Sequence, residues 1–281
     1  MTSPLSSAQA ARTALATRLR HLRLDAGLAG HQLSEACGWH PAKTSRLEHG
    51  HAIPSDTDIR TWCTACDADG QAEDLIAAMR SATSMYMEWK RLNRAGLTSL
   101  QQEIVPLVEH TRQFRVYCSN VIPGLLQTPA YAAAVISAYG TFHGTTDDVE
   151  AAAAARVKRS RVLRKRGRQF AFLIEEAVLH SGLAGPETTA AQLDHLLELT
   201  TLPQVSLGII ATRASRPLWS MESFTIYDNT QVGIELLSAR VTVTAPGEIT
   251  TYERAFADLT TRAVRGDGAR ALIERAAAAH R

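Results

Sequence analysis

The positions at which helices must start and stop near the N-terminus restrict the fold of this chain more than any other feature. Leu15, Leu19 and Leu22 recur at helical spacing, which predicts a helix over residues 8–26. Gly27 should end that helix, because glycine adopts a left-handed backbone conformation at little cost. The further helices predicted in this part of the chain cover residues 30–37, 41–49, 56–66 and 72–94. Five such helices, joined by turns of a few residues, indicate a small helical domain.

A tight turn over Gly38, Trp39 and His40 separates the second and third of these helices. His40 should be the N-cap of the third helix, Pro41 its first residue, and Gly50 its end. Two helices joined by such a turn form the helix-turn-helix unit, whose second helix enters the major groove of DNA. We therefore expect residues 41–49 to form a recognition helix.

The outward face of this third helix carries the side chains expected to meet DNA. Thr44 and Leu47 should face the core. Arg46 can bind a guanine bidentately, and the small side chains of Ala42 and Ser45 allow close approach to the bases. The side chains that can meet phosphates are those of His40, Lys43 and His49. The complete predicted DNA-binding set is Gly30, His31, His40, Pro41, Ala42, Lys43, Ser45, Arg46 and His49.

Charge is distributed unevenly over this domain, although the whole chain has a net charge of only +2. Residues 12–46 contain six basic and two acidic side chains, whereas residues 56–74 contain six acidic side chains and one arginine. The first segment can approach phosphates and the second repels them. Glu48 is expected to bind Arg20 or Arg23 inside the domain, which would remove that arginine from the phosphate contacts.

This stretch resembles the XRE or Cro/repressor family of helix-turn-helix regulators. The matching segments are Leu19 to Arg23, Leu33 to Trp39, Ser45 to Gly50, and Pro54. The family often has glutamine at the start of the second helix, where it contacts phosphate. Gly30 and His31 stand there in this sequence, so the phosphate anchor is expected to be weaker or to use backbone N–H groups alone. A domain of this type that has lost DNA binding is the alternative.

The rest of the chain is predicted to mix helices and strands. Helices are expected over residues 101–119, 129–139, 147–165, 186–201, 250–264 and 268–279, and strands over residues 169–174, 205–210, 223–227 and 231–237. The predicted fold class is mainly α with a smaller mixed β part. We expect a five-helix helix-turn-helix domain (residues 1–80), a helical linker (81–110) and an α+β domain for partner binding and dimerisation (111–281). A homodimer is expected because one recognition helix reads only a few base pairs.

Behind a helix-turn-helix domain, the second half resembles the uncharacterised C-terminal domain of antitoxin-like regulators from filamentous, sporulating bacteria. The segments that carry the resemblance are Pro123 to Ala132, Arg156 to Arg161, Phe172 to Leu179, Gln192 to Leu199, Ser223 to Ile226 and Tyr252 to Leu259. The resemblance implies a repressor or autoregulator encoded beside a small partner protein. The strands at 205–210, 223–227 and 231–237 could offer an edge to that partner. A small-molecule sensor is the alternative, since a mixed α/β domain can enclose a pocket.

A basic run also lies in this half. Eight Lys or Arg side chains and no acidic side chain occur between residues 156 and 168. The run could be a solvated helix end, where the helix dipole favours cations. It could also dock an acidic partner or touch the DNA backbone.

The sequence contains none of the common catalytic signatures, such as GxSxG, a P-loop, a dinucleotide fingerprint or HExxH. Glu175 and Glu176 are adjacent, which is poor geometry for an acid–base pair on a strand. Cys63 and Cys66 lack the second ligand pair of a zinc site. Because neither a signal peptide nor an apolar spanning stretch is evident, we expect a cytoplasmic protein that is not an enzyme and uses no cofactor or metal.

Overall fold

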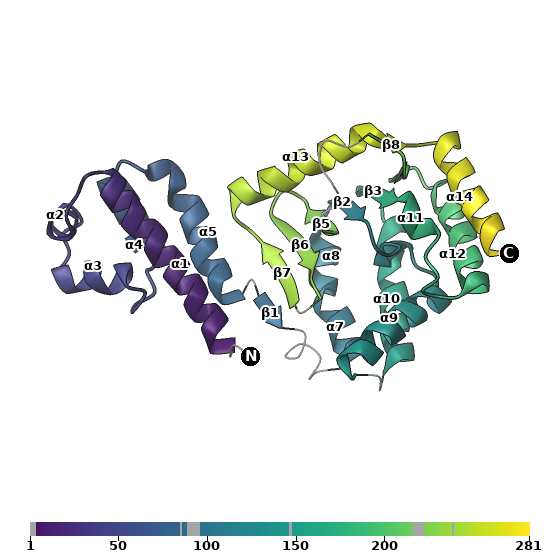
Figure 1. The fold of residues 1–281 in the computed structure, drawn as a ribbon, viewed down its shortest axis with the longest axis horizontal. Helices are drawn as coiled ribbons and strands as arrows, with labels where there is room; N and C mark the ends of the chain where they lie inside the picture. The colour runs from purple at the N-terminus through teal and green to yellow at the C-terminus, as the bar shows by residue number, and fades with distance from the viewer. Residues whose placement is uncertain (1–3, 85, 89–95, 146–147, 216–221, 238) are drawn as a thin grey trace. The chain divides into compact units, whose positions relative to one another are not determined.

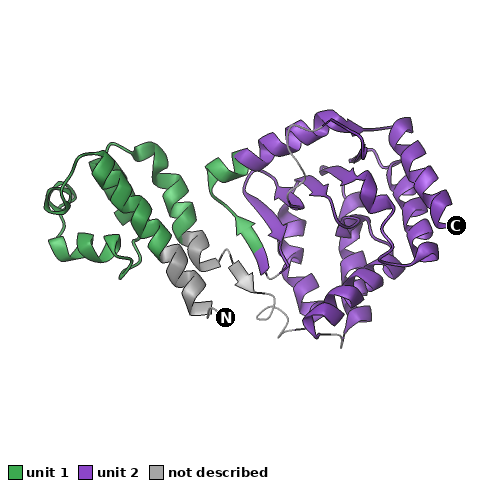
Figure 2. Ribbon diagram, in the orientation of Figure 1, with its two compact units in different colours: residues 1–86, 241–250 green, residues 87–240, 251–281 purple. Residues whose placement is uncertain are grey.

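The computed structural model describes residues 4–84, 86–88, 96–145, 148–215, 222–237 and 239–281 (Figure 1). The chain divides into two compact units (Figure 2). Unit 1 comprises residues 1–86 and 241–250, and unit 2 comprises residues 87–240 and 251–281. The domain boundaries expected at residues 80 and 110 stay predictions. None of the described helices combines the length and the hydrophobicity of a membrane-spanning segment.

Unit 1 contains the five helices that the sequence predicts. Their bounds are α1 (Pro4–Asp25), α2 (Gly30–Ala36), α3 (Pro41–Glu48), α4 (Asp56–Ala65) and α5 (Ala72–Ser84), with a 3-10 turn η1 (Asp69–Gln71) before α5. Trp62 is fully buried among Leu19, Leu33 and Leu75. Its Nε1 donates to the carbonyl of Leu19 at 3.0 Å, so the polar atom of the indole is satisfied inside the core. This shared core stabilises helices that would be marginal in isolation.

Local signals set the ends of these helices. Gly27, Gly38 and Gly50 have φ angles of 69°, 66° and 66°, in the left-handed region that follows a helix end. At the start of α4, the Asp58 N–H donates to Ser55 Oγ (3.1 Å) and the Ser55 N–H donates to Asp58 Oδ2 (3.0 Å). These reciprocal bonds satisfy donors that a helix start leaves open.

From residue 86 onward the chain alternates strands with helices. The strands are β1 (Tyr86–Glu88), β2 (Gln113–Cys118), β3 (Gln169–Glu175), β4 (Val205–Ile210), β5 (Phe224–Tyr227), β6 (Gln231–Glu235), β7 (Ala239–Val243) and β8 (Ala263–Val264). The helices are α7 (Leu97–Glu103), α8 (Val105–His110), α9 (Pro129–His143), α10 (Val149–Arg159), α11 (Glu176–Leu179), α12 (Pro186–Leu199), α13 (Pro246–Arg262) and α14 (Asp267–His280). Two 3-10 turns, η3 (Gly124–Leu126) and η4 (Ser160–Arg164), precede α9 and follow α10.

The strands form one mixed sheet in the order β1-β7-β6-β5-β2-β3-β4-β8. β2, β3 and β4 run parallel, whereas β5 is antiparallel to both β2 and β6. Phe114 pairs with Phe170 on one side and with Tyr227 on the other. Because side chains alternate between the two faces of a sheet, these three rings share one face, where they form a core with side chains of α9, α12 and α14.

The opposite face of the sheet contacts α13. Tyr252 packs against Phe224 with 5.0 Å between ring centroids. Glu253 forms an ion pair with Arg115 at 3.0 Å. The predicted fold class, a helix-turn-helix domain followed by an α+β domain, is confirmed.

Several predicted elements are wrong. The helix predicted over residues 101–119 ends at residue 110, and residues 113–118 form β2. This strand is flanked by two others and packs on both faces, so it lacks the polar alternation that distinguishes a strand from a helix. The helix predicted over 72–94 ends at Ser84, and β1 follows, because pairing with β7 replaces the helical hydrogen bonds there. Residues 85 and 89–95 of that prediction lie outside the described residues.

Two boundaries also differ in the last third of the chain. β7 was not predicted, and α13 begins at Pro246 rather than at residue 250. The helix predicted over residues 147–165 is α10 followed by the 3-10 turn η4.

The three strands expected to offer an edge to a partner are internal. β4 lies between β3 and β8, β5 between β2 and β6, and β6 between β5 and β7. β5 and β6 have a strand on each side and cannot accept another one. β4 pairs with β8 only at Ile209 and Ile210, so its first residues are paired on one side alone. The expectation of edge addition is therefore wrong for β5 and β6, and stays a prediction for the first residues of β4.

Candidate DNA-binding site

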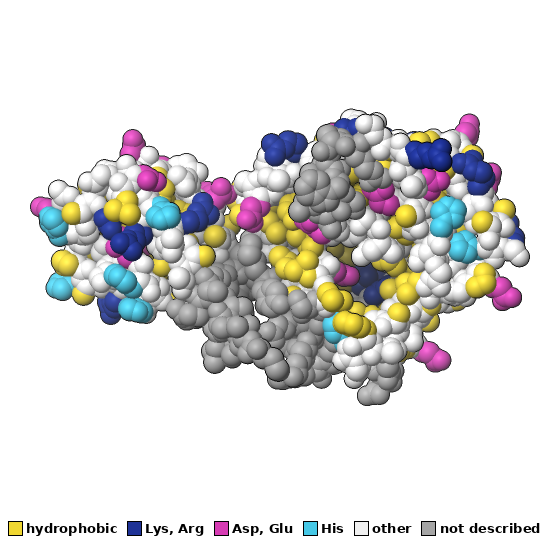
Figure 3. All heavy atoms as spheres, in the orientation of Figure 1, with side chains coloured by type: hydrophobic (Ala, Val, Ile, Leu, Met, Phe, Trp, Pro, Cys, Tyr) yellow, Lys and Arg dark blue, Asp and Glu magenta, His cyan; other side chains and the backbone are white. Residues whose placement is uncertain are grey.

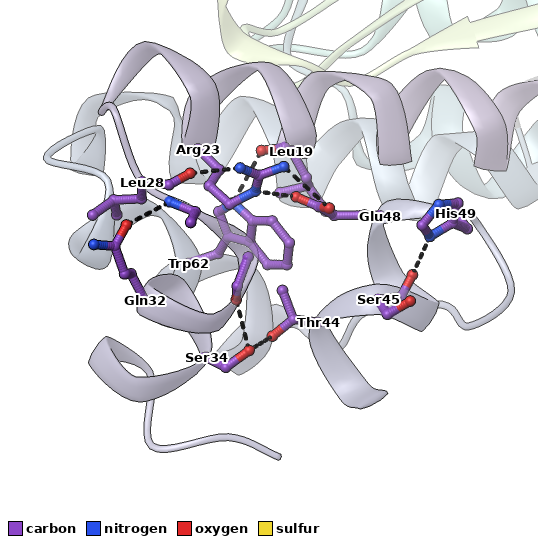
Figure 4. A network of polar contacts seen from close by, with 12 residues as sticks. Leu19, Arg23, Leu28, Gln32, Ser34, Thr44, Ser45, Glu48, His49 and Trp62 are labelled. Carbon is purple, nitrogen blue, oxygen red and sulfur yellow. Dashed lines mark hydrogen bonds and ion pairs between the residues drawn. The ribbon is translucent and has the colours of Figure 1, made fainter. Parts of the chain in front are cut away.

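A buried hydrogen bond joins α2 to α3 (Figure 4). Ser34 Oγ donates to the carbonyl of Gly30 at 2.8 Å and lies 2.7 Å from Thr44 Oγ1. A serine hydroxyl has a single proton, so the hydroxyl of Thr44 is the donor in the second bond. Both side chains are only 2% exposed. The bond therefore fixes the angle between the two helices in a water-free environment, where it is strong.

α3 begins at Pro41, as predicted, with His40 as its N-cap. His40 Nδ1 accepts from the N–H of Ala42 at 3.2 Å. The proton of the neutral ring is then on Nε2, which leaves that atom as a donor for an outside partner.

The outward face of α3 is small and basic. Thr44 and Leu47 face the core, as predicted, and are 2% and 3% exposed. Ala42, Ser45 and Arg46 are exposed. Arg46 makes no side-chain hydrogen bond or ion pair with any residue that the structure describes. Its guanidinium is thus available to a base edge. Figure 3 shows basic and histidine side chains on the drawn face of unit 1.

Lys43 differs from Arg46 because its charge is already engaged. Its Nζ lies 2.5 Å from Asp58 Oδ1 and 4.2 Å from the centroid of the Trp39 ring. Burial raises the pKa of Asp58, but the hydrogen bonds from Lys43 and Ser55 outweigh burial and lower it below its ordinary value. A phosphate would have to compete with this carboxylate for Lys43.

The expected bond of Glu48 inside the domain is confirmed, and its partner is Arg23 (Figure 4). Arg23 Nε donates to Glu48 Oε1 at 2.5 Å and Nη2 donates to Oε2 at 3.3 Å. Arg23 Nη1 also donates to the carbonyl of Leu28 at 2.5 Å. The two side chains are 10% and 9% exposed. Arg23 is therefore not a phosphate contact, and the only acid of α3 is neutralised inside.

The first turn of α2 holds a residue that the sequence analysis missed. Gly30 and His31 begin the helix, and the His31 side chain is exposed. Gln32, in the same turn, accepts at Oε1 from the N–H of Ala29 at 2.7 Å. Its amide NH₂ then remains free to donate outward, as Figure 4 shows. The glutamine three positions after the N-cap is the sequence signal that could have identified it.

His49 closes the predicted set at the end of α3. Its Nδ1 lies 2.7 Å from the carbonyl of Ser45, and its ring stacks on that of His51 with 5.9 Å between centroids. Both histidines are exposed. His51, which the sequence analysis did not single out, therefore extends the outward face beyond the helix end.

The basic run of residues 156–168 is divided between the interior and the surface of unit 2. Arg156 and Arg159 are half-buried and bind Gln101. Arg168 Nη1 donates to the carbonyls of Val108 and Thr111 at 2.7 Å each, at the end of α8. The interpretation as a solvated helix end is wrong for these three arginines. The exposed remainder consists of Lys158, Arg161, Arg164, Lys165 and Arg166.

Comparison with family models accounts for both units. A model described as "Helix-turn-helix domain" matches residues 14–76. A model described as "Domain of unknown function (DUF5753)" matches residues 101–275, which is more than half of the chain. The chain belongs to the DUF5753 family. It is a helix-turn-helix, DNA-binding regulator in which the DUF5753 domain follows the DNA-binding domain.

Two further comparisons add little to this assignment. No curated protein matches the chain. Among solved structures, the chain is similar to one reported as "Structure of TrmBL2, an archaeal chromatin protein, shows a novel mode of DNA binding". The two share 10% identity over 81% of this chain and 71% of the other, with a TM-score of 0.35. That score is too low to support an argument about function.

Proposed function

We propose that this chain is a sequence-specific transcription regulator of the XRE type, in which α3 reads the major groove and the first turn of α2 binds phosphate. One observation supports this most directly. The single acid of α3, Glu48, is neutralised by Arg23 inside the domain, while Arg46 is left exposed without a partner among the described residues. A helix that turns its carboxylate inward and its guanidinium outward is suited to the acceptor-rich edge of guanine.

The test replaces Arg46 and measures binding to fragments of the promoter of the gene itself. Arg46→Ala should lower the discrimination at one base pair by about 1–3 kcal/mol. Arg60→Ala is the matched control, because it removes the same charge from α4, where Arg60 pairs with Glu73 at 2.5 Å. Equal affinity and specificity of the Arg46 variant and the wild type would show that α3 is not the recognition helix.

We also propose that the chain acts as a homodimer that represses or autoregulates its own gene. One recognition helix contacts only a few base pairs, and a twofold-symmetric pair doubles the site. Most described apolar side chains of α1 to α5 pack into the core around Trp62, with Leu24 as an exposed exception, so dimer contacts are expected beyond residue 80.

A small partner protein encoded beside the gene, as in antitoxin-like regulators, is the third part of the proposal. Lys158, Arg161, Arg164 and Arg166 support an acidic partner, because these exposed cations make no ion pair within the described part of unit 2. Titration of the neighbouring gene product into the full-length chain, with and without operator DNA, tests it. Absence of binding at about 10 μM, an affinity of about 7 kcal/mol, would exclude the partner.

A further inference from the structure

Two arginines of unit 2 carry charges that no acid of the described residues neutralises by an ion pair. Arg156 and Arg159 are three positions apart on α10, so their side chains share one helix face. Burial lowers the pKa of Arg156 to about 10, with Arg159 lowering it further and Glu235 opposing both. Burial likewise lowers the pKa of Arg159 below its ordinary value. Arginine side chains stay protonated in proteins, so the two guanidiniums repel each other.

The partners of these two guanidiniums are neutral. Arg156 Nε donates to Gln101 Oε1 and its Nη1 to Gln127 Oε1, both at 3.1 Å. Arg159 Nη1 donates to the carbonyl and the Oε1 of the same Gln101, at 3.2 and 3.4 Å. Arg159 Nε is buried without a hydrogen-bond partner. Most buried polar atoms in proteins have a partner, and a buried cation without an anion is costly.

Two side chains with hydroxyl groups, those of Thr225 and Tyr227, lie on the core-facing side of β5. The register places Thr225 beside Val116 and beside Gly233, so Thr225 and Tyr227 lie on the face that carries Phe114. Burial raises the pKa of Tyr227 to about 12, and the charges of Arg159 and Glu235 both act on it. Arg159 therefore interacts electrostatically with Tyr227.

Gly124, which has no side chain, lies beside both arginines. A Cβ added to Gly124 would lie 3.6 Å from Arg159 Nη2 and 3.7 Å from Arg156 Cδ, which is ordinary contact and not a clash. On its drawn face, unit 2 has a hollow with hydrophobic side chains around it and charged side chains within it (Figure 3). The side chains of Arg156 and Arg159 are half-buried, so solvent reaches part of each.

We propose that Arg156 and Arg159 form the anion-binding end of a ligand site in the DUF5753 domain, which takes a small organic molecule bearing a carboxylate or phosphate group. The Nη2 of each guanidinium supplies N–H donors in the planar arrangement that suits such anions, and the buried Nε of Arg159 adds a donor that no described residue satisfies. The hydrophobic surround favours a ligand with an apolar body. A DNA backbone is less suitable, because both side chains are half-buried and engaged by neutral partners. The site goes beyond DNA binding and would make the second unit a sensor.

The experiment titrates two probes, benzoate and phenyl phosphate, into the full-length chain by calorimetry at constant ionic strength. Benzyl alcohol is the neutral control, and the two probes distinguish carboxylate from phosphate ligands. At least one anion should bind, and Arg156→Met or Arg159→Met should weaken it about 10- to 100-fold, the effect of losing a charged hydrogen bond. Arg164→Met removes an exposed cation of the same run and should leave the affinity within about twofold, as expected of a screened surface charge.

Thermal unfolding without ligand distinguishes a ligand-binding role of the two arginines from a purely structural role. Arg159→Met should not lower the melting temperature, since it removes a repelled cation with an orphaned N–H. A large loss of stability together with no anion binding by the wild type at about 10 mM, an affinity of only about 3 kcal/mol, would overturn the proposal. An equal loss of affinity in Arg164→Met would overturn it as well. If Arg159→Met does not fold, Arg159→Lys keeps the charge but not the planar donors, and unchanged affinity in that variant would exclude the site.

Discussion

Arg23 and Arg46 show how neighbouring side chains decide what a charge does. Arg23 is buried against Glu48 and against the carbonyl of Leu28, so its three bonds hold α1, α3 and the turn between α1 and α2 together. Arg46 is exposed on the opposite side of α3. The same residue type thus stabilises the domain in one position and is available to DNA in the other.

Removing one partner of the Arg23–Glu48 pair should destabilise unit 1 strongly. Arg23→Ala or Glu48→Ala leaves an uncompensated buried charge, and we expect a loss of about 3–5 kcal/mol in the free energy of unfolding. The exposed pair of Arg60 and Glu73, whose side chains are 55% and 62% accessible, is the control. Its removal should cost about 0–1 kcal/mol in the same chemical denaturation measurement. Similar losses for both pairs would contradict the assignment of Arg23 to the core.

The sequence predicted the inward side of α3 better than its outward side. Thr44, Leu47 and the bond of Glu48 follow from helical spacing and from one expected charge partner, all within a short stretch. The engagement of Lys43 could not be predicted, because Asp58 reaches it from α4 and is 15 residues away in the chain. Gln32 was missed although the start of α2 was predicted at the observed residue, because the capping role of a glutamine at this position was not considered.

At the scale of elements, the contact between α2 and α3 depends on two hydroxyl groups. Ser34→Ala should destabilise the fold by about 1–3 kcal/mol, because it leaves the Thr44 hydroxyl buried without a partner. Operator affinity should fall as well, since the angle of α3 is no longer fixed.

The double variant Ser34→Ala with Thr44→Val is the control for this pair. Replacing both partners by apolar groups of similar shape is nearly neutral, so stability should return towards that of the wild type. A double variant no more stable than Ser34→Ala would show that packing, and not the hydrogen bond, holds the two helices.

Asp148 holds the start of α7 from a distant part of the chain. Its Oδ1 accepts from the N–H of Leu97 at 3.0 Å and its Oδ2 from the N–H of Thr98 at 2.7 Å. Burial raises the pKa of Asp148, but these hydrogen bonds outweigh burial and lower it. A carboxyl whose pKa is lower in the folded state contributes stability above its unfolded pKa of about 4, and that stability is lost as pH falls through the folded pKa.

Replacing Asp148 should therefore make the free energy of unfolding depend less on pH in the acid range. Asp148→Ala should cost about 0.5–2 kcal/mol at neutral pH, as for other helix caps, and the difference from the wild type should shrink below about pH 4. Asp25→Ala, which removes an exposed carboxylate at the end of α1, is the control for charge alone. A difference that stays constant between about pH 3 and 7 would exclude the carboxylate as the cause.

Strand β2 shows why the type of some elements could not be predicted from the sequence. Phe114, Val116 and Tyr117 are buried on both faces of the sheet, so the segment shows neither strand alternation nor a helical stripe. β4, in contrast, was predicted with its observed bounds because two threonines and a proline, at positions 200, 201 and 203, separate it from the helix before it. Whether a short apolar segment forms a strand or a helix depends on the strands that lie beside it in the sheet. Those strands are distant in the sequence, so the segment alone does not predict the outcome.

At the scale of the whole molecule, the proposed homodimer has a measurable consequence. Sedimentation equilibrium at micromolar concentration should give twice the chain mass of 30.5 kDa. The operator should contain two half-sites roughly 34 Å apart. Inserting about five base pairs between them turns one half-site to the far side of the duplex and should abolish cooperative binding, whereas about ten base pairs should restore it in part. A monomer that binds one half-site as tightly as the full operator would exclude the dimer.

The order of strands in the sheet determines when the protein can fold during synthesis. Arg115 of β2 pairs with Ile226 of β5, which leaves the ribosome more than one hundred residues later. At about 5–20 residues per second, the nascent chain waits about 5–20 seconds with the outer edge of β2 unpaired. α1 to α4, by contrast, have all emerged before residue 70. The helices of the helix-turn-helix domain can therefore form first, whereas the sheet of the DUF5753 domain stays incomplete until β5 has been synthesised.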